Sequence, residues 1–268
     1  MVPNRFAALA RDLEPTRTVH RSRRTVNGFG VHDVIIETPD HSQGMALMSG
    51  AHVADVLRIY RTRYSELSLD PRIAHITIFK NHGSDAGTSL EHPHSELVAT
   101  PVISHQVRER LQQALNHYDE YGDCMFCQMI QEELEEQARV VMVTPHFAAV
   151  KLFASASPFS TCIYPLRHMA SFGYISGAGI NDLAHVLRTV LASSTPDSKH
   201  PDFNHTIRIA PSECFGARYH CYVSIIPRMT RVAGFELGSG IFINTVLPET
   251  ASEFLHQVKV DHADAAVV

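Results

Sequence analysis

An internal repeat constrains the fold of this 268-residue chain more than any other feature of its sequence. His41 and His92 are 51 positions apart, and His168 and His220 are 52 positions apart. Two unrelated segments would not be expected to share this spacing, so it indicates a structural unit duplicated within the chain. The aligned segments are 2–9 with 143–150, 34–41 with 162–168, and 76–79 with 205–209.

Short β-branched runs bounded by proline, glycine or aspartate predict that each copy is rich in strands. Apolar residues at helical spacing add helices at 52–63, 105–121 and 181–193, and Pro248 and Glu249 begin a short helix ending at 258. The fold class is therefore α+β, with residues 1–118 as the first half, 119–260 as the second half and 261–268 as a flexible tail. A turn-rich loop is expected at 193–201. The predicted strands are 31–38, 73–79, 97–103, 139–143, 147–153, 161–164, 205–209 and 222–226.

Composition excludes several classes of protein. The net charge of −5 argues against a general nucleic-acid surface. No apolar stretch reaches the length of a membrane span, and the N-terminus lacks the apolar core of a signal peptide. Five cysteines, two of them in a Cys-x-x-Cys motif, suit a reducing compartment, so we expect a cytoplasmic protein. The arginine-rich run at 17–24 is either a solvated loop or a loop that steers phosphates.

The Cys-x-x-Cys motif also points to a metal site. Cys124 and Cys127 place two thiolates on one turn, and the repeat supplies His168 and His220 as two further ligands. This set predicts a closed, structural Zn²⁺ site with Cys₂His₂ ligands. Two alternatives remain open: a pair of unligated thiols beside ordinary histidines, and a redox-active Cys-x-x-Cys motif.

A candidate nucleophile occurs in only one copy of the repeat. His94 lies in a His-Pro-His sequence, whereas its counterpart in the second copy is Tyr222. A neutral imidazole can attack phosphorus directly, and Pro93 fixes the backbone beside it. Upstream, the small residues from Gly83 to Ser89 allow close backbone approach and offer donors to phosphate oxygens. The sequence thus predicts phosphoryl-type chemistry, with a purely structural role for His94 as the alternative.

With these motifs, the chain resembles the galactose-1-phosphate uridylyltransferase family, a branch of the histidine-triad superfamily, over nearly its whole length. The segments that carry the resemblance are 2–9, 32–41, 81–96, 124–127 and 234–244. The resemblance implies two tandem histidine-triad-like halves, each an antiparallel sheet with covering helices. It implies that His94 forms a nucleotidyl-histidine intermediate and that sugar 1-phosphate leaves. It also implies a homodimer that completes the sugar site.

Further site residues follow from the same resemblance. Asn4 and Phe6 match positions that hold base and ribose, and Asn81, Gly87 and Ser89 match phosphate contacts; Glu236 matches a residue near the sugar. Other roles remain open for three of them: core packing for Phe6, a turn cap for Ser89 and a surface strand for Glu236.

Two departures from the family pattern affect the expected chemistry. Glu96 stands where the family commonly has glutamine, and an ionised carboxylate repels phosphoryl oxygens instead of donating to them. His41 and His92 match two ligands of a second metal site that lacks its cysteine pair, because the chain begins within the first repeat. We therefore expect that site to be incomplete.

The expected activity is that of a UDP-glucose:hexose-1-phosphate uridylyltransferase acting on a nucleotide sugar and a sugar 1-phosphate. A phosphorylase is the alternative enzyme, with phosphate as acceptor and an ADP-sugar or a dinucleoside polyphosphate as donor. A degenerate, non-catalytic nucleotide-binding protein is the alternative from another class.

Overall fold

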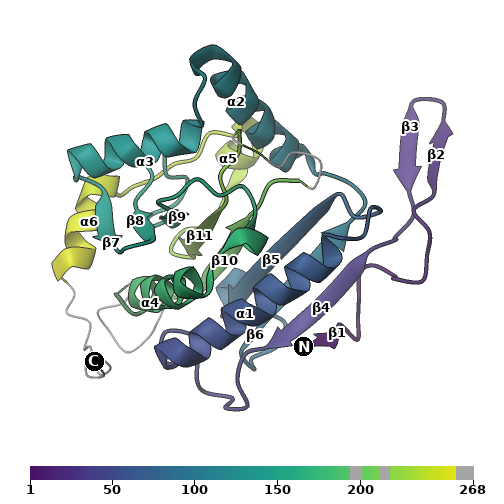
Figure 1. Cartoon of the computed structure of the whole chain (residues 1–268), viewed down its shortest axis with the longest axis horizontal. Helices are drawn as coiled ribbons and strands as arrows, with labels where there is room; N and C mark the ends of the chain where they lie inside the picture. The colour runs from purple at the N-terminus through teal and green to yellow at the C-terminus, as the bar shows by residue number, and fades with distance from the viewer. Residues whose placement is uncertain (194–200, 212–215, 217, 258–268) are drawn as a thin grey trace.

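A single nine-stranded antiparallel sheet forms the centre of the molecule (Figure 1). The structure is a computed structural model, and it describes residues 1–193, 201–211, 216 and 218–257. The strand order is β1-β4-β6-β5-β10-β11-β9-β8-β7. In that order the strands are β1 (Val2–Pro3), β4 (Val31–Ile36), β6 (His94–Thr100), β5 (His75–His82), β10 (Phe203–Arg208), β11 (Tyr222–Pro227), β9 (Thr161–Pro165), β8 (Phe147–Val150) and β7 (Val140–Val143).

The strand order is symmetric about its centre. The series β4-β6-β5 of the first half is followed by β10-β11-β9, the corresponding strands of the second half in reverse order. The halves meet where β5 and β10 pair antiparallel, with Asn81 opposite Asn204 and Lys80 opposite His205. This arrangement is the one that a duplicated unit produces when its two copies share one sheet.

Helices cover the two faces of the sheet differently. On one face lie α1 (Gly50–Leu67) and α4 (Gly177–Ser193), whose apolar residues share a core with both halves, including Ile78 and Ile207. On the other face, α2 (His105–Tyr121) and α3 (Met125–Glu136) contribute to a second core, whose strand residues all come from the second half and include Tyr164 and Tyr222. The strand residues of the first half that face away from α1 are therefore left for a site.

Local sequence explains where the long helices begin and end. The hydroxyl of Ser49 accepts a hydrogen bond from the His52 N–H and so caps α1, and Ser104 caps α2 in the same way. Gly122 ends α2 in the left-handed conformation with φ of 80°, which glycine adopts without steric cost.

The α+β class and the antiparallel pairing are confirmed, and each predicted strand has an observed counterpart, with bounds that differ by a few residues. The predicted division between residues 118 and 119 falls inside α2, so the two-half division stays a prediction from the repeat.

Some elements differ from expectation. The arginine-rich run is wrong as a loop, because it forms an exposed hairpin of β2 (Arg17–His20) and β3 (Arg23–Val26). Two helices were not predicted: α3, and the short α5 (Gly234–Ser239). The last helix, α6, is observed at Pro248–Gln257. The predicted tail at 261–268 and most of the predicted loop at 193–201 lie outside the described residues. Within the described parts of the chain, no helix is both long and apolar enough to cross a membrane.

Candidate active site and metal cluster

His94 is the first residue of β6 and is held with one ring nitrogen engaged. Its Nδ1 lies 2.8 Å from the carbonyl oxygen of His92, across Pro93. A carbonyl can only accept, so Nδ1 carries a proton, and in the neutral form of the ring the lone pair is on Nε2. The residue is only 6% exposed, which restricts the ring to this orientation. The geometry therefore selects Nε2 as the nitrogen that can act as a nucleophile.

A small-residue turn follows β5 at the same end of the sheet. Gly83 and Gly87 flank the 3₁₀ turn η1 (Ser84–Ala86) with φ of 84° and 82°. A Cβ atom on Gly83 would lie 1.8 Å from a carboxylate oxygen of Asp202, which also accepts the N–H of Asp85 at 2.6 Å. The positive φ and this close contact both favour glycine at position 83, because another residue would be strained and would displace the Asp202 carboxylate.

Asn81 is oriented by the second half of the chain. Its Oδ1 accepts from the Nδ2 of Asn204 at 2.7 Å, and the same Nδ2 lies 2.9 Å from the carbonyl oxygen of Ala86. Because Oδ1 is engaged in this way, the amide N–H groups of Asn81 are the donors that it can offer to a ligand. The two halves thus cooperate at the cradle.

Glu96 lies on the same face of β6 as His94, two residues further on, but its carboxylate is engaged. Oε2 is 2.6 Å from Nε2 of His32 on β4, and the Nδ1 of His32 accepts from the backbone N–H of Ala8 at 3.2 Å. The Nε2 of His32 is also 3.0 Å from the Nδ2 of Asn4. His32 therefore links the Glu96 carboxylate to the N-terminal strand. No role had been assigned to His32 from sequence.

On the opposite, helix-covered face, a buried polar network supports the nucleophile. The Nζ of Lys80 lies 2.7 Å from Oε2 of Glu37 and 3.0 Å from the carbonyl oxygen of His94 itself. Ser95 donates to the same carboxylate, and Tyr60 donates to Ser95. The sequence interpretation missed this network. One feature of the sequence could have indicated it: Lys80 lies on the same face of β5 as the buried Ile76 and Ile78.

His205 of β10 extends this buried layer. It pairs with Lys80 across the central strands, and both of its ring nitrogens are buried without a hydrogen-bond partner among the described residues. Burial, followed by the charge of Lys80, lowers the pKa of His205 to about 3. The imidazole is therefore neutral at physiological pH.

The four predicted metal ligands converge in the structure. The ligand atoms of Cys124, Cys127, His168 and His220 all lie within 4.8 Å of one another. The Sγ of Cys127 is 3.3 Å from Nδ1 of His168 and 3.4 Å from Nδ1 of His220. A tetrahedral zinc ion with bonds of about 2.3 Å to sulfur and about 2.0 Å to nitrogen separates such atoms by about 3.5 Å. The cluster can therefore hold a metal ion.

The surroundings of the cluster favour its metal-binding form. Cys124 caps the N-terminus of α3 and Cys127 lies in its first turn, where the helix dipole stabilises thiolates. Hydrogen bonding from Cys127 lowers the pKa of Cys124, so one thiolate forms readily. The Nε2 of His168 is 3.1 Å from the carbonyl oxygen of Gly216, which orients the ring with Nδ1 toward the sulfur.

The remaining predicted site residues make fewer contacts with His94 or with the metal cluster. His41 and His92 meet with their Nδ1 atoms 3.0 Å apart. Phe6 is 84% exposed, so core packing is wrong as its alternative role. Ser89 is exposed in the turn before Pro93. Glu236 lies in α5, not in a surface strand, and accepts the N–H of Ala233 at 2.8 Å. The hydrogen bonds among the described residues do not connect Glu236 to His94.

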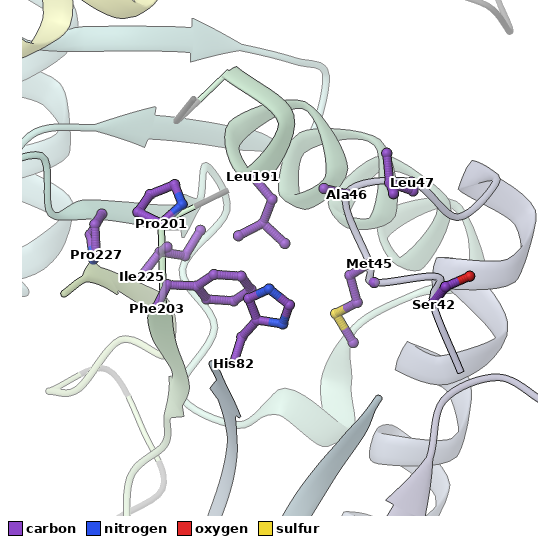
Figure 2. A pocket seen from close by; sticks show the side chains of 11 residues that line it. Ser42, Met45, Ala46, Leu47, His82, Leu191, Pro201, Phe203, Ile225 and Pro227 are labelled. Atoms are coloured by element: carbon purple, nitrogen blue, oxygen red, sulfur yellow. The ribbon is translucent and has the colours of Figure 1, made fainter. Parts of the chain in front are cut away.

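An apolar cavity of about 280 Å³ lies near this end of β5 but on the helix-covered face (Figure 2). The side chains of Met45 and Leu191 point into it, and the His82 ring stacks on Phe203 with centroids 4.9 Å apart. Among the described residues, no lysine, arginine or carboxylate lines it, so the described lining offers no charged partner for a phosphate group.

The chain is similar to known proteins in sequence and in fold. Residues 1–104 match the family model for the galactose-1-phosphate uridyl transferase N-terminal domain. The ADP-glucose phosphorylase of Arabidopsis thaliana is 31% identical, over 97% of this chain and 74% of its own length. The galactose-1-phosphate uridylyltransferase of Thermotoga maritima is 28% identical, over 96% of this chain and 84% of its own length. A structure of the Arabidopsis phosphorylase with bound ADP-glucose has a TM-score of 0.87 at 31% identity, covering 96% of this chain and 80% of that one.

Proposed function

The chain belongs to the galactose-1-phosphate uridylyltransferase family, and we propose that it transfers a nucleotidyl group from a nucleotide sugar through a covalent intermediate on His94. Its relatives are nucleotidyltransferase-type enzymes, and the chain is an enzyme of this type. The observation that carries the proposal is the hydrogen bond from His94 Nδ1 to the carbonyl oxygen of His92, because it leaves Nε2 as a nucleophile that needs no base.

In the proposed first step, the Nε2 lone pair of His94 attacks the α-phosphorus of the donor. The bond from that phosphorus to the bridging oxygen breaks, and sugar 1-phosphate leaves with the electron pair. Nδ1 keeps its proton and shares it with the His92 carbonyl, so the positive charge on the modified ring is partly compensated. The turn around Gly83 and Gly87 and the amide of Asn81 supply donors for the phosphoryl oxygens.

In the second step, an acceptor phosphate oxygen attacks the same phosphorus and the phosphorus–nitrogen bond breaks. We infer a hexose 1-phosphate as acceptor and a UDP-hexose as donor, as in a uridylyltransferase. A phosphorylase using inorganic phosphate is the second candidate. The 31% identity to an ADP-glucose phosphorylase over 97% of the chain favours this second candidate.

The decisive experiment is transfer of label to the protein. UDP-glucose and ADP-glucose, each labelled at the α-phosphorus, are mixed in turn with the full chain and with His94→Ala. We expect acid-labile label on the unmodified chain and none on the variant. Adding hexose 1-phosphate or inorganic phosphate then identifies the acceptor from the product. If neither donor labels the unmodified chain but both bind, the non-catalytic alternative replaces the proposal.

We also propose that the cluster of Cys124, Cys127, His168 and His220 holds a structural zinc ion. Two thiolates and two imidazoles whose ligand atoms lie within 4.8 Å of one another are a ligand set that zinc favours. With four protein ligands no position is left for substrate, so the ion would stabilise the second half and take no part in transfer. His41 and His92 supply only two imidazoles, and we expect no tight metal binding there.

A homodimer remains part of the proposal. The segment around α5 exposes large apolar side chains, among them Phe235, Leu237 and Ile241 at 55%, 77% and 61%. A surface of this kind commonly marks a protein interface. A second copy covering it would also bring Glu236 near a binding site, which the described contacts within one chain do not do. Mass measured by light scattering tests this point.

A further inference from the structure

A second cavity lies on the same face of the sheet as His94 but at the opposite end of β5 and β6. Its volume is about 330 Å³. Thr100, one of its lining residues, is six positions from His94 along β6, which corresponds to about 20 Å. A ligand in this cavity would be too distant to contact the nucleophile. Among the residues that line the cavity are His75, Thr77, Ser104, Arg110, Thr206 and Arg208.

Positive charge gathers in this cavity. Arg110 comes from α2 and Arg208 from β10, and both are partly buried. Burial lowers the pKa of the Arg208 guanidinium, and the neighbouring charge of Arg110 lowers it further. Among the residues that the structure describes, neither arginine forms an ion pair and no aspartate or glutamate lines the cavity. Two arginines kept together in this way favour an anionic ligand.

Uncharged polar groups complete the lining of the cavity. The Nδ1 of His75 is buried and has no hydrogen-bond partner among the described residues. The hydroxyls of Thr77 and Thr206 lie on neighbouring strands of the same lining. Ser104 caps α2 at the rim, where the N-terminus of a 17-residue helix adds positive potential. Donors therefore reach the cavity from the sheet and from the helix.

The cavity lies where the two halves of the repeat meet, because residues of both halves line it. Arg208 aligns with Phe79, and Thr206 aligns with Thr77 of the first half. Tyr219, which also lines the cavity, is three residues before Tyr222, the counterpart of His94. The second half therefore has arginine and tyrosine here, a combination that can hold an oxyanion but cannot form a phosphorus–nitrogen bond.

We propose that this cavity is a second, non-catalytic site that binds a phosphate group through Arg110 and Arg208. Its volume lies at the lower end of the range for small-molecule sites, so it suits inorganic phosphate or a small phosphate monoester better than a whole nucleotide sugar. All of these ligands carry a phosphate group. Which group is attached to the phosphate is determined by the binding test.

The test is equilibrium binding by calorimetry with three probes: inorganic phosphate, a hexose 1-phosphate and a nucleoside monophosphate. The full chain is compared with Arg110→Gln/Arg208→Gln. The control is Arg58→Gln/Arg61→Gln, which makes the same change in net charge on α1, on the opposite face of the sheet. All three proteins are first checked for equal secondary structure by circular dichroism. The probe bound most tightly by the full chain identifies the group attached to the phosphate.

We expect the full chain and the control variant to bind at least one of the three probes. In Arg110→Gln/Arg208→Gln, the affinity for that probe should fall at least tenfold. Arg110→Lys/Arg208→Lys should retain part of it, because charge is kept while paired donors are lost. Labelling of His94 should be unchanged in all variants, so this test and that of the proposed function can fail separately. Unaltered binding of all three probes by the glutamine variant would overturn the proposal.

Discussion

Lys80→Met should be among the most damaging single substitutions outside the reacting groups. Lys80 is 1% exposed and Glu37 is 3% exposed, so the ion pair between them is out of contact with water. Removing the lysine leaves the Glu37 carboxylate buried with only hydroxyl neighbours such as Ser95. Breaking a buried pair in this way costs about 3–5 kcal/mol. That is a large part of the total stability of about 5–15 kcal/mol expected for a folded protein.

Urea unfolding followed by far-ultraviolet circular dichroism measures this cost. With a denaturant slope of about 3 kcal/mol per molar, the midpoint should fall by about 1–2 M. Lys151→Met is the matched control, because Lys151 is equally buried but donates only to the carbonyl of Phe159 and the hydroxyl of Thr161. Its loss leaves no buried charge, and we expect a cost of about 1–3 kcal/mol.

A double-mutant cycle makes the reasoning refutable. Glu37→Gln removes the carboxylate charge but keeps an acceptor for Ser95, so it should recover at least about 2 kcal/mol in the Lys80→Met background. If the unfolding cost of the double variant instead equals the sum of the two single costs within about 0.5 kcal/mol, the ion pair is not the source of the effect. Because Lys80 also donates to the carbonyl of His94, Lys80→Met should slow labelling of His94 even in protein that remains folded.

Three further outcomes are expected. Cys127→Ser should remove the zinc, measured by elemental analysis as about one ion per chain in the unmodified protein, and should lower the unfolding temperature; full zinc content in the variant would contradict the ligand set. Gly83→Ala should cost at least about 1 kcal/mol more in unfolding free energy than Gly87→Ala, because both have positive φ but only the former places its Cβ against a carboxylate. His32→Ala should slow labelling of His94 by leaving Glu96 a free carboxylate, and Glu96→Gln should restore the rate in that background; absence of rescue would refute this role for His32.

Sequence alone predicted the parts of this molecule that depend on local pattern. Helix α2 was predicted with its observed bounds, 105–121, and the structure shows that Ser104 and Gly122 cap its two ends. The His-Pro-His sequence and the Cys-x-x-Cys motif led to residues that the structure gathers into clusters. In each case the chemistry is encoded within a few consecutive residues, or in spacing that the repeat makes visible.

The sequence did not predict contacts between side chains that only the pairing of strands brings together. Lys80 and Glu37 are 43 residues apart, and no motif connects them. Arg110 of α2 and Arg208 of β10 line one cavity, and the predicted strands and helices did not specify where that helix lies on the sheet. His32 lies in a segment that the sequence analysis singled out, but its contact with Glu96 could not be predicted. That contact depends on the pairing of β4 with β6, which places Val34 opposite Glu96.

The two halves differ chiefly in what lies on the face of the sheet that carries His94 in the first half. There the strand residues around His94 and Glu96 are left uncovered by helices, whereas the counterpart Tyr222 packs against Phe126 of α3 with ring centroids 5.6 Å apart. The cysteines of the metal cluster lie at the start of α3, so a bound ion would fix the helix that closes this face. Because β5 and β10 pair directly, Asn204 of β10 donates to Asn81 of β5 and orients its amide. We therefore propose that the second half of the chain acts as a scaffold that holds the residues around His94 in position.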